Sequence, residues 1–197
     1  MSALLQHIKR YFPDEEIIID DIALYFNNKR YPKKHVLLHA GEVCRFEAFI
    51  LKGCIKSYFI NKDGQEVILT FATENWWVSD IASFQDERPS RMWIETMEDC
   101  ELLTIKPEDK EALLKKFPFL ERMFRLLVQR HLAAYQERLF GNIALTAEER
   151  YDEFLKKFPA LPVRVPQHQI AAYLGISPES LSRLRNKKRQ KRTAKED

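Results

Sequence analysis

The residues best suited to chemistry lie in the segment QHQIAAYLGISPESLSRL, from Gln167 to Leu184. Ala171 is small enough for two helices to cross closely, and Gly175, four residues later, suits a turn with positive φ. Ser177 can cap a second helix, whose first residue would be Pro178 because proline needs no amide partner there. All these requirements are met in one short window, which predicts a helix-turn-helix.

The second helix of this motif would present side chains that can recognise bases. Leu181 and Leu184 would face inward, leaving Glu179, Arg183 and neighbouring polar residues on the outer face. Arg183 can donate a two-pronged hydrogen bond to guanine, and Glu179 can accept one from the amino group of cytosine. A surface ion pair between Glu179 and Arg183 is the alternative, and it is compatible with DNA binding because it could orient Arg183.

A group of positive charges follows the motif. Residues 178–197 contain eight basic and three acidic residues, a net charge of +5 in a chain of net +3. The basic residues are Arg183, Arg185, Lys187, Lys188, Arg189, Lys191, Arg192 and Lys195. This asymmetry favours double-stranded DNA as the partner, although charge alone also fits a solvated tail. The predicted DNA-binding residues are Gln167, Ser177, Glu179, Ser180, Arg183, Lys187 and Lys188. The two lysines are expected to contact phosphates, and His168 is expected to be exposed to solvent.

The segment before this motif has the patterns of strands and then of helices. Short β-rich runs are expected at His35–Leu38, Phe46–Leu51, Cys54–Ile60, Glu66–Ala72, Met92–Thr96 and Cys100–Ile105. Many short strands of this kind indicate a sandwich or a rolled barrel. Residues before Lys33 are expected to be helical. Helices are also expected from Pro107 to Phe117, from Phe119 to about Gly141, and from a capping box at Thr146 to Phe158. Three prolines, Pro159, Pro162 and Pro166, predict an extended link to the motif.

The long helix from Phe119 carries two apolar stripes. One holds Phe124, Val128, Leu132, Tyr135 and Leu139; the other holds Leu120, Met123, Leu127 and Ala134. A helix that covers one core usually needs only one stripe. The second stripe and the coiled-coil-like spacing predict a homodimer. A single helix sunk deep in a monomer core is the alternative.

Composition excludes several classes of protein. The chain has 197 residues, enough for one domain or two small ones. No apolar run approaches the ~18 residues of a membrane span, and the N-terminus lacks the apolar region of a signal peptide. We therefore expect a cytoplasmic protein with no membrane partner. The three cysteines have no metal-binding spacing and are expected to be reduced core thiols.

The order of these parts resembles the Crp/Fnr family of bacterial transcription regulators. The resemblance rests on six motifs: His39–Glu42 (HAGE), Leu51–Gly53 (LKG), Asn61–Glu66 (NKDGQE), Trp76–Phe84 (WWVSDIASF), Thr146–Tyr151 (TAEERY) and Leu174–Arg185 (LGISPESLSRLR). It implies an α+β chain with an N-terminal double-stranded β-helix, a cyclic nucleotide-binding-like jelly roll, with N-terminal helices at 1–116. A dimerisation helix at 117–142 would follow, and then a winged-helix-like helix-turn-helix with a truncated wing and a basic tail at 143–197.

The resemblance also implies a function. Family members read a palindromic promoter site through the second helix of the motif and contact RNA polymerase, so both DNA and RNA polymerase are expected partners. Glu179 and Arg183 fall on the family's usual base-reading positions. Pro178 stands where many members carry a DNA-contacting arginine, so the recognised sequence is expected to differ.

The effector expected of this family is less well defined. Cyclic-nucleotide binders carry a Gly-Glu pair and later an Arg-Ser or Arg-Thr pair, whereas this chain has Ser79-Asp80, and Ser90 stands where the phosphate-binding arginine would be. Losing that charge-assisted pair argues against cyclic AMP. The absence of an N-terminal cysteine cluster argues against an iron–sulfur cluster. The sequence identifies no cofactor, and it leaves open whether a small-molecule effector binds at all. The candidate pocket residues are Trp76, Asp80, Ser90 and Arg91.

Two other functions fit parts of the sequence. A cupin-like β-barrel metalloenzyme would use His35, His39 and Glu42, but four residues along a strand span about 13 Å, whereas a metal lies roughly 2 Å from each histidine nitrogen. We therefore expect no metal site and no enzyme. A ligand-binding module without specific DNA recognition is the second alternative, but it leaves the coincidence of Ala171, Gly175 and Ser177 unexplained.

Overall fold

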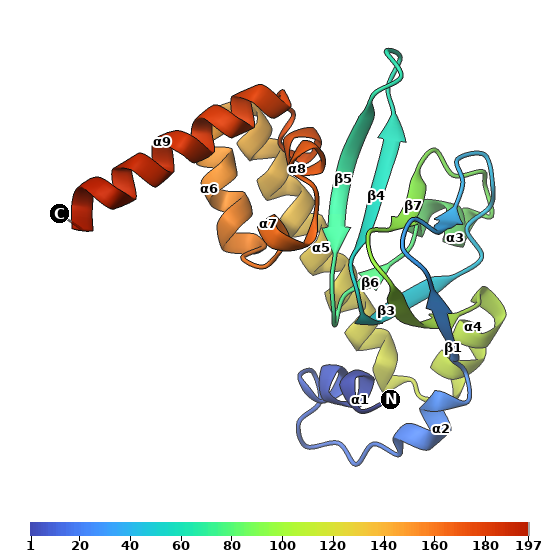
Figure 1. The fold of residues 1–197 in the computed structure, drawn as a ribbon. Coiled ribbons are helices and arrows are strands. Elements are labelled where there is room, and N and C mark those ends of the chain that lie inside the picture. The colour runs from blue at the N-terminus through green and yellow to red at the C-terminus, as the bar shows by residue number, and fades with distance from the viewer. Residues whose placement is uncertain (197) are drawn as a thin grey trace. The chain divides into compact units, whose positions relative to one another are not determined.

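The computed structural model describes residues 1–196, with side chains described through Lys188 and at Gln190. The chain divides into two compact units, one made of 1–60 and 69–131 and the other of 61–68 and the chain from Leu132 onward. Figure 1 follows the chain from the blue N-terminus to the red C-terminal helix. The side chains of Arg189, Lys191, Arg192 and Lys195, which the sequence assigns to a basic tail, lie outside the described residues.

Two four-stranded sheets form the β-roll. The first has the order β1 (Asn27–Tyr31), β8 (Cys100–Ile105), β3 (Glu47–Lys52) and β6 (Trp77–Val78). The second has the order β2 (Val36–Leu38), β7 (Trp93–Thr96), β4 (Ile55–Ile60) and β5 (Glu66–Ala72). All six predicted strand runs are confirmed. The mixed architecture of a β-roll and C-terminal helices is the one expected.

The N-terminal segment differs in part from the prediction. It contains two helices, α1 (Ser2–Lys9) and α2 (Ile19–Ala23), but Asn27–Tyr31 is a strand and not a helix. Four of the five residues of β1 are exposed, so the strand lacks the apolar alternation that would have revealed it. Its pairing with β8, which sets Lys29 opposite Leu102, fixes it in the sheet.

Alternation along the strands separates two cores. Ala48 and Ile50 of β3 point between the sheets, where they meet Ile55, Ile94 and other buried residues. Phe49 points to the opposite side of the first sheet. There it joins a cluster with residues of α1, α4 (Pro107–Lys116) and α5 (Phe119–Ala144). The break between α4 and α5 falls at Phe117 and Pro118, as the proline predicts.

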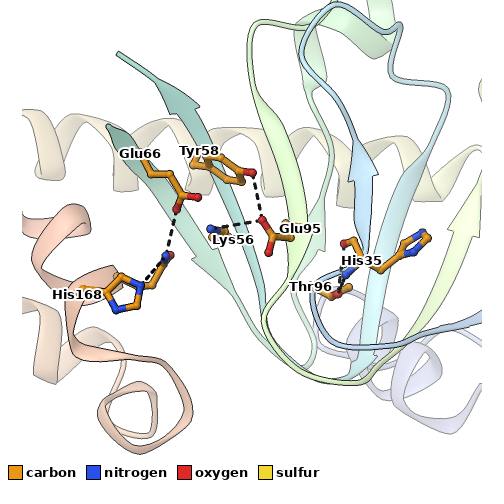
Figure 2. Close-up of polar contacts among 8 residues, drawn as sticks. His35, Lys56, Tyr58, Glu66, Glu95, Thr96 and His168 are labelled. Atoms are coloured by element: carbon orange, nitrogen blue, oxygen red, sulfur yellow. Dashed lines mark hydrogen bonds and ion pairs between the residues drawn. The ribbon is translucent and has the colours of Figure 1, made fainter. Parts of the chain in front are cut away.

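A polar cluster lies on the second sheet. The register of β4 and β7 sets Lys56 opposite Glu95, and their Nζ and Oε2 atoms are 3.4 Å apart. The Tyr58 hydroxyl donates a hydrogen bond of 3.1 Å to the same carboxylate, as Figure 2 shows. The charge on Lys56 is therefore paired by a cross-strand neighbour.

The second unit is helical. Besides the end of α5 it contains α6 (Ala147–Lys157), α7 (Leu161–Arg164), α8 (Gln167–Leu174) and α9 (Pro178–Glu196). The predicted capping box is confirmed, because Thr146 Oγ1 accepts a hydrogen bond from the Glu149 amide and Glu149 accepts one from the Thr146 amide. These bonds hold the pKa of the Glu149 carboxyl below its usual value.

One expectation about the C-terminal part is not met, and a second is not confirmed. The link after α6 is not simply extended, because it contains the short helix α7; Pro162 lies in its first turn, where a missing amide costs little. Within residues 1–196 no strand follows β8, and the chain beyond Arg185 continues α9 to Glu196, so a shortened wing is not confirmed. The division at 116 and 142 stays a prediction, since α5 contributes to both compact units.

Across the described residues, no helix combines the length and the apolar character needed to cross a bilayer. All three cysteines, Cys44, Cys54 and Cys100, are buried free thiols, as predicted. Burial raises the pKa of Cys100 to about 11, which keeps this thiol protonated.

The turn between β3 and β4 yields a stability prediction. Gly53 has φ of +108°, and a Cβ there would lie 2.5 Å from Cys100 Sγ and 3.0 Å from the Asp99 carbonyl oxygen. Gly53→Ala should therefore lower the free energy of unfolding by about 2–4 kcal/mol, from backbone strain and overpacking together. Urea denaturation measures the loss.

Gly41 provides the matched control. It has φ of +95°, but a Cβ there would meet nothing within 4 Å. Gly41→Ala should cost only the backbone term, about 1 kcal/mol. Equal losses for the two variants would contradict the close approach at Gly53.

Candidate nucleic-acid interface

The turn between α8 and α9 has the predicted local geometry. Gly175 ends α8 in the left-handed region, with φ of 66° and ψ of 36°. Ala171 is fully buried, and its carbonyl oxygen accepts a 3.1 Å hydrogen bond from the amide of Ile176. Ser177 Oγ accepts one of 3.2 Å from the Ser180 amide and so satisfies a donor of the first turn of α9. The direction in which α9 leaves the turn therefore follows from local sequence.

The two faces of α9 differ in burial. Leu181 is 1% exposed and anchors the helix, while Leu184 is half-buried. Glu179 and Arg183 are exposed, and Ser180 is half-buried between them. The first two turns of α9 thus present an acceptor and a donor outward, as the spacing predicts.

A chain of hydrogen bonds orients the exposed arginine. Arg183 Nη2 donates to Ser180 Oγ at 3.1 Å, and Ser180 Oγ also accepts from Ser177 Oγ at 3.2 Å. The backbone amide of Glu179, the Ser177 hydroxyl and the charge of Arg183 lower the pKa of the Glu179 carboxyl. Glu179 is therefore ionised and an acceptor at neutral pH, and Arg183 acts on it electrostatically while bonding to Ser180.

The two lysines assigned to phosphates pair with α6. Lys187 Nζ lies 2.8 Å from Glu148 Oε2, and Lys188 forms an ion pair with Asp152. Lys187 is the more exposed of the two lysines. These pairs hold the middle of α9 against α6, a role that sequence spacing did not reveal because the acids lie 36 or more positions upstream.

The start of α8 lies beside a pocket. Gln167 is half-buried, and its amide donates to the Pro162 carbonyl oxygen at 3.2 Å. His168 is exposed, as expected. A cavity of about 410 Å³ lies between the first turn of α8 and one side of α9; it is lined by Gln167, Pro178, Leu181, Ser182, Arg185 and Asn186. Ser182 and Asn186 were not singled out from the sequence, since small polar residues on a helix carry no spacing signal.

The long helix α5 leaves one of its two stripes open. Leu120 and Met123 are 1% exposed and pack in the core of the first unit. By contrast, apolar side chains from Val128 onward are between 48% and 79% exposed: Val128, Leu132, Tyr135, Leu139, Phe140 and Ile143. This is a large apolar surface for a helix of a monomer.

The predicted effector residues are only partly brought together. Asp80 caps α3 (Ile81–Asp86) by accepting from the Ser83 amide at 3.2 Å. Its other oxygen accepts a 2.7 Å hydrogen bond from Ser90 Oγ, and both side chains are buried. Arg91 is exposed, and the Trp76 ring lies 6.5 Å from the His131 ring. The carboxylate expected to bind a ligand hydroxyl already has two protein donors.

The histidines of the metalloenzyme alternative do not converge. His39 Nδ1 is 3.3 Å from Glu42 Oε2, whereas the ring of His35 stacks on that of Tyr31 at 4.8 Å. The His35 amide donates to Thr96 Oγ1, as Figure 2 shows. Among the side chains that the structure describes, no three from acidic, histidine or cysteine residues come together as a metal site would require.

Comparison with known proteins places this architecture. Residues 28–117 match the family described as Cyclic nucleotide-binding domain. The chain is 22% identical over 166 residues to the cAMP-activated global transcriptional regulator CRP of Escherichia coli, covering 79% of each. It is 28% identical over 167 residues to the Anaerobic regulatory protein of Haemophilus influenzae, covering 79% of this chain and 64% of that protein.

Solved structures are similar as well. FixK2 of Bradyrhizobium japonicum has a TM-score of 0.75 at 17% identity, with 84% of this chain and 85% of that chain covered. The c-di-GMP responsive global regulator CLP of Xanthomonas campestris has a TM-score of 0.71 at 18% identity, covering 88% and 91%. A cyclic nucleotide-binding β-roll followed by C-terminal helices defines a class of transcription regulators. The chain shares this architecture and is similar to regulators of the Crp/Fnr family, and these relatives are transcription regulators.

The cap of α9 can be tested on its own. Ser177→Ala removes the acceptor of the Ser180 amide and should lower the free energy of unfolding by about 1 kcal/mol. Ser182→Ala, at an exposed position in the second turn of the same helix, should change it by less than about 0.5 kcal/mol. Thermal or urea unfolding of the two variants compares them. Equal stabilities would contradict the capping role.

Proposed function

We propose that the protein is a DNA-binding transcription regulator that reads a palindromic site as a homodimer. The observation that carries this proposal is the turn at Gly175, which exposes Glu179 and Arg183 on the first turns of α9 while Leu181 stays buried. In helix-turn-helix proteins the first turns of the second helix enter the major groove. Ionised Glu179 and forked Arg183 are chemically suited to cytosine and guanine there.

The remaining residues of the interface would supply affinity. Gln167 and Ser177, at the starts of α8 and α9, would bind backbone phosphates, and Ser180 would orient Arg183 through its hydroxyl. On binding DNA, Lys187 and Lys188 would either leave Glu148 and Asp152 of α6 to pair with phosphates, or keep these ion pairs and contact phosphates with their solvent-exposed N–H groups. The continuous α9 takes the place of a truncated wing in this proposal.

Dimerisation would use the open stripe of α5. Val128, Leu132, Tyr135 and Leu139 follow one another at spacings of four, three and four, which is the spacing of a coiled-coil seam. Burying them against a second copy removes an apolar surface from water. A twofold axis parallel to α5 would then place two copies of α9 on half-sites about 34 Å apart. RNA polymerase, which family members contact, would be the further partner.

The β-roll in this proposal responds to an effector other than cyclic AMP, or to none. Ser90 supplies a hydroxyl where cyclic-nucleotide binders supply a cation, and that hydroxyl is bonded to buried Asp80. A cyclic phosphate placed there would face the Asp80 side chain without the compensating positive charge. A different small molecule would have to satisfy or displace the Asp80–Ser90 bond.

The proposal predicts no response to cyclic AMP. Adding millimolar cyclic AMP should shift the melting temperature by less than about 1 °C and DNA affinity by less than about twofold, since a ligand stabilises only the state that it binds. Thermal shift and fluorescence anisotropy measure both, with the Escherichia coli regulator as positive control. Saturable cyclic AMP binding with raised DNA affinity would contradict the assignment of Ser90.

The base-reading role of Arg183 is tested on a site selected from random DNA by the purified protein. Arg183→Ala should weaken binding to that site by about 1–3 kcal/mol and relax the preference at one base pair in each half-site. Anisotropy titrations on the selected site and its single-base variants measure both effects. An unchanged preference would remove Arg183 from base recognition.

A paired lysine variant is the control for this experiment. Lys187→Gln with Lys188→Gln should weaken all DNA sequences alike and flatten the salt dependence of binding, because phosphate contacts carry no sequence information. If selection enriches no palindrome with the unmodified protein, the alternative of a ligand-binding module without specific DNA recognition is favoured.

A further inference from the structure

Arg138 of α5 joins three elements of the second unit. Its Nη2 atom donates to the Ile68 carbonyl oxygen at 2.7 Å and to the Tyr173 carbonyl oxygen at 2.9 Å. Its guanidinium carbon lies 4.1 Å from the centre of the Tyr173 ring. Ile68 belongs to β5 and Tyr173 to α8, so one side chain of the long helix holds both a hairpin strand and the first helix of the motif.

The Tyr173 carbonyl is a favourable partner for a cation. Tyr173 lies in the last turn of α8, where the final carbonyls have no partner within the helix and carry the negative end of its dipole. Burial lowers the pKa of Arg138, but a guanidinium keeps its charge in proteins. Arg138 is half-buried, and carbonyl oxygens that accept its hydrogen bonds offset the partial loss of water and constrain its geometry.

The hairpin also holds the other end of α8. Gln169 lies in the first turn of α8 and is buried, and its Nε2 donates to Glu66 Oε2 at 3.1 Å. Figure 2 shows Glu66 reaching from β5 toward the start of α8 beside His168. The segment Asn61–Ile68 is part of the same compact unit as the motif. Helix α8 is therefore fixed at its first turn by Glu66 and at its last turn by Arg138.

We propose that Arg138 is a positioning residue that sets the angle of α8 and α9 against α5, and thereby the half-site spacing that the dimer accepts. This inference rests on the proposed function, in which α5 forms the dimer seam. Because α9 packs on α8 around fully buried Ala171, a rotation of α8 carries the recognition surface with it. Glu66 and Gln169 support the same placement from the opposite end.

The test compares spacing variants of one DNA site. The selected palindrome is measured beside two copies whose half-sites are one base pair closer or farther apart, and beside a single half-site. The unmodified full-length protein should prefer the natural spacing by about tenfold or more. With Arg138→Gln this preference should fall to about threefold or less, while affinity for the single half-site changes by less than about twofold.

Arg130→Gln is the matched control. Arg130 lies eight residues earlier on α5, is exposed, and donates to the Tyr11 hydroxyl, so the variant removes the same charge without touching α8. It should keep the spacing preference of the unmodified protein. A merely structural role of Arg138 would weaken every DNA alike and leave the ratio between spacings unchanged, and that result would overturn the inference.

A second variant guards against misfolding of the first. Arg138→Lys keeps the charge but lacks the planar fork that serves two carbonyls at once, so its spacing preference should lie between those of Arg138→Gln and the unmodified protein. A preference equal to that of the unmodified protein would also overturn the inference. Absence of any palindrome preference in the unmodified protein would instead overturn the proposed function on which the inference rests.

Discussion

The left-handed turn at Gly175 is the constraint on which the functional half of the molecule depends. With φ of 66°, this residue reverses the chain at a position where a side chain would be strained, and buried Ala171 allows α9 to pack closely on α8. Leu181 then lies inward and Arg183 outward because they are two positions apart on a helix. The exposed surface of α9 is thus a consequence of backbone geometry, and its chemistry follows from which residues stand there.

The β-roll is organised by a different constraint, the alternation of side chains along its strands. Alternating residues of β3 supply two cores, one between the sheets and one toward α1, α4 and α5. In the part of the β-roll where cyclic nucleotides are expected to bind, the buried polar groups form hydrogen bonds with one another. Asp80 accepts hydrogen bonds from Ser83 and Ser90, so each of its two carboxylate oxygens already has a protein donor. A ligand that approached Asp80 would have to satisfy or displace these hydrogen bonds.

Features encoded locally could be predicted from the sequence. The cap at Thr146, the turn at Gly175 and the helix break at Pro118 each depend on residues within four positions of one another, and the structure confirms them. The sequence predicts helix where β1 lies because this strand is polar and exposed, and only its pairing with β8 holds it in the sheet. Its signal therefore lies some 70 residues away and not in its own composition.

Large separations in sequence also explain why the contacts that hold α8 and α9 could not be predicted. Arg138 contacts Ile68 across 70 positions, and Gln169 contacts Glu66 across 103. The sequence assigns Lys187 and Lys188 to phosphates and does not reveal their ion pairs with Glu148 and Asp152, which form only because α6 packs on α9. Residue type and spacing predict which side chains of α9 are exposed, but they do not show which of its charges are paired within the protein.

The central claim is that α9 binds in the major groove of DNA. Interference by guanine methylation tests this claim directly. Methylation at N7 blocks the groove edge that a forked arginine would contact. On a selected site, the account predicts that methylated guanines prevent binding in two patches related by twofold symmetry and one helical turn apart. Binding that tolerates every N7 methyl group, or interference confined to a single patch, would contradict it.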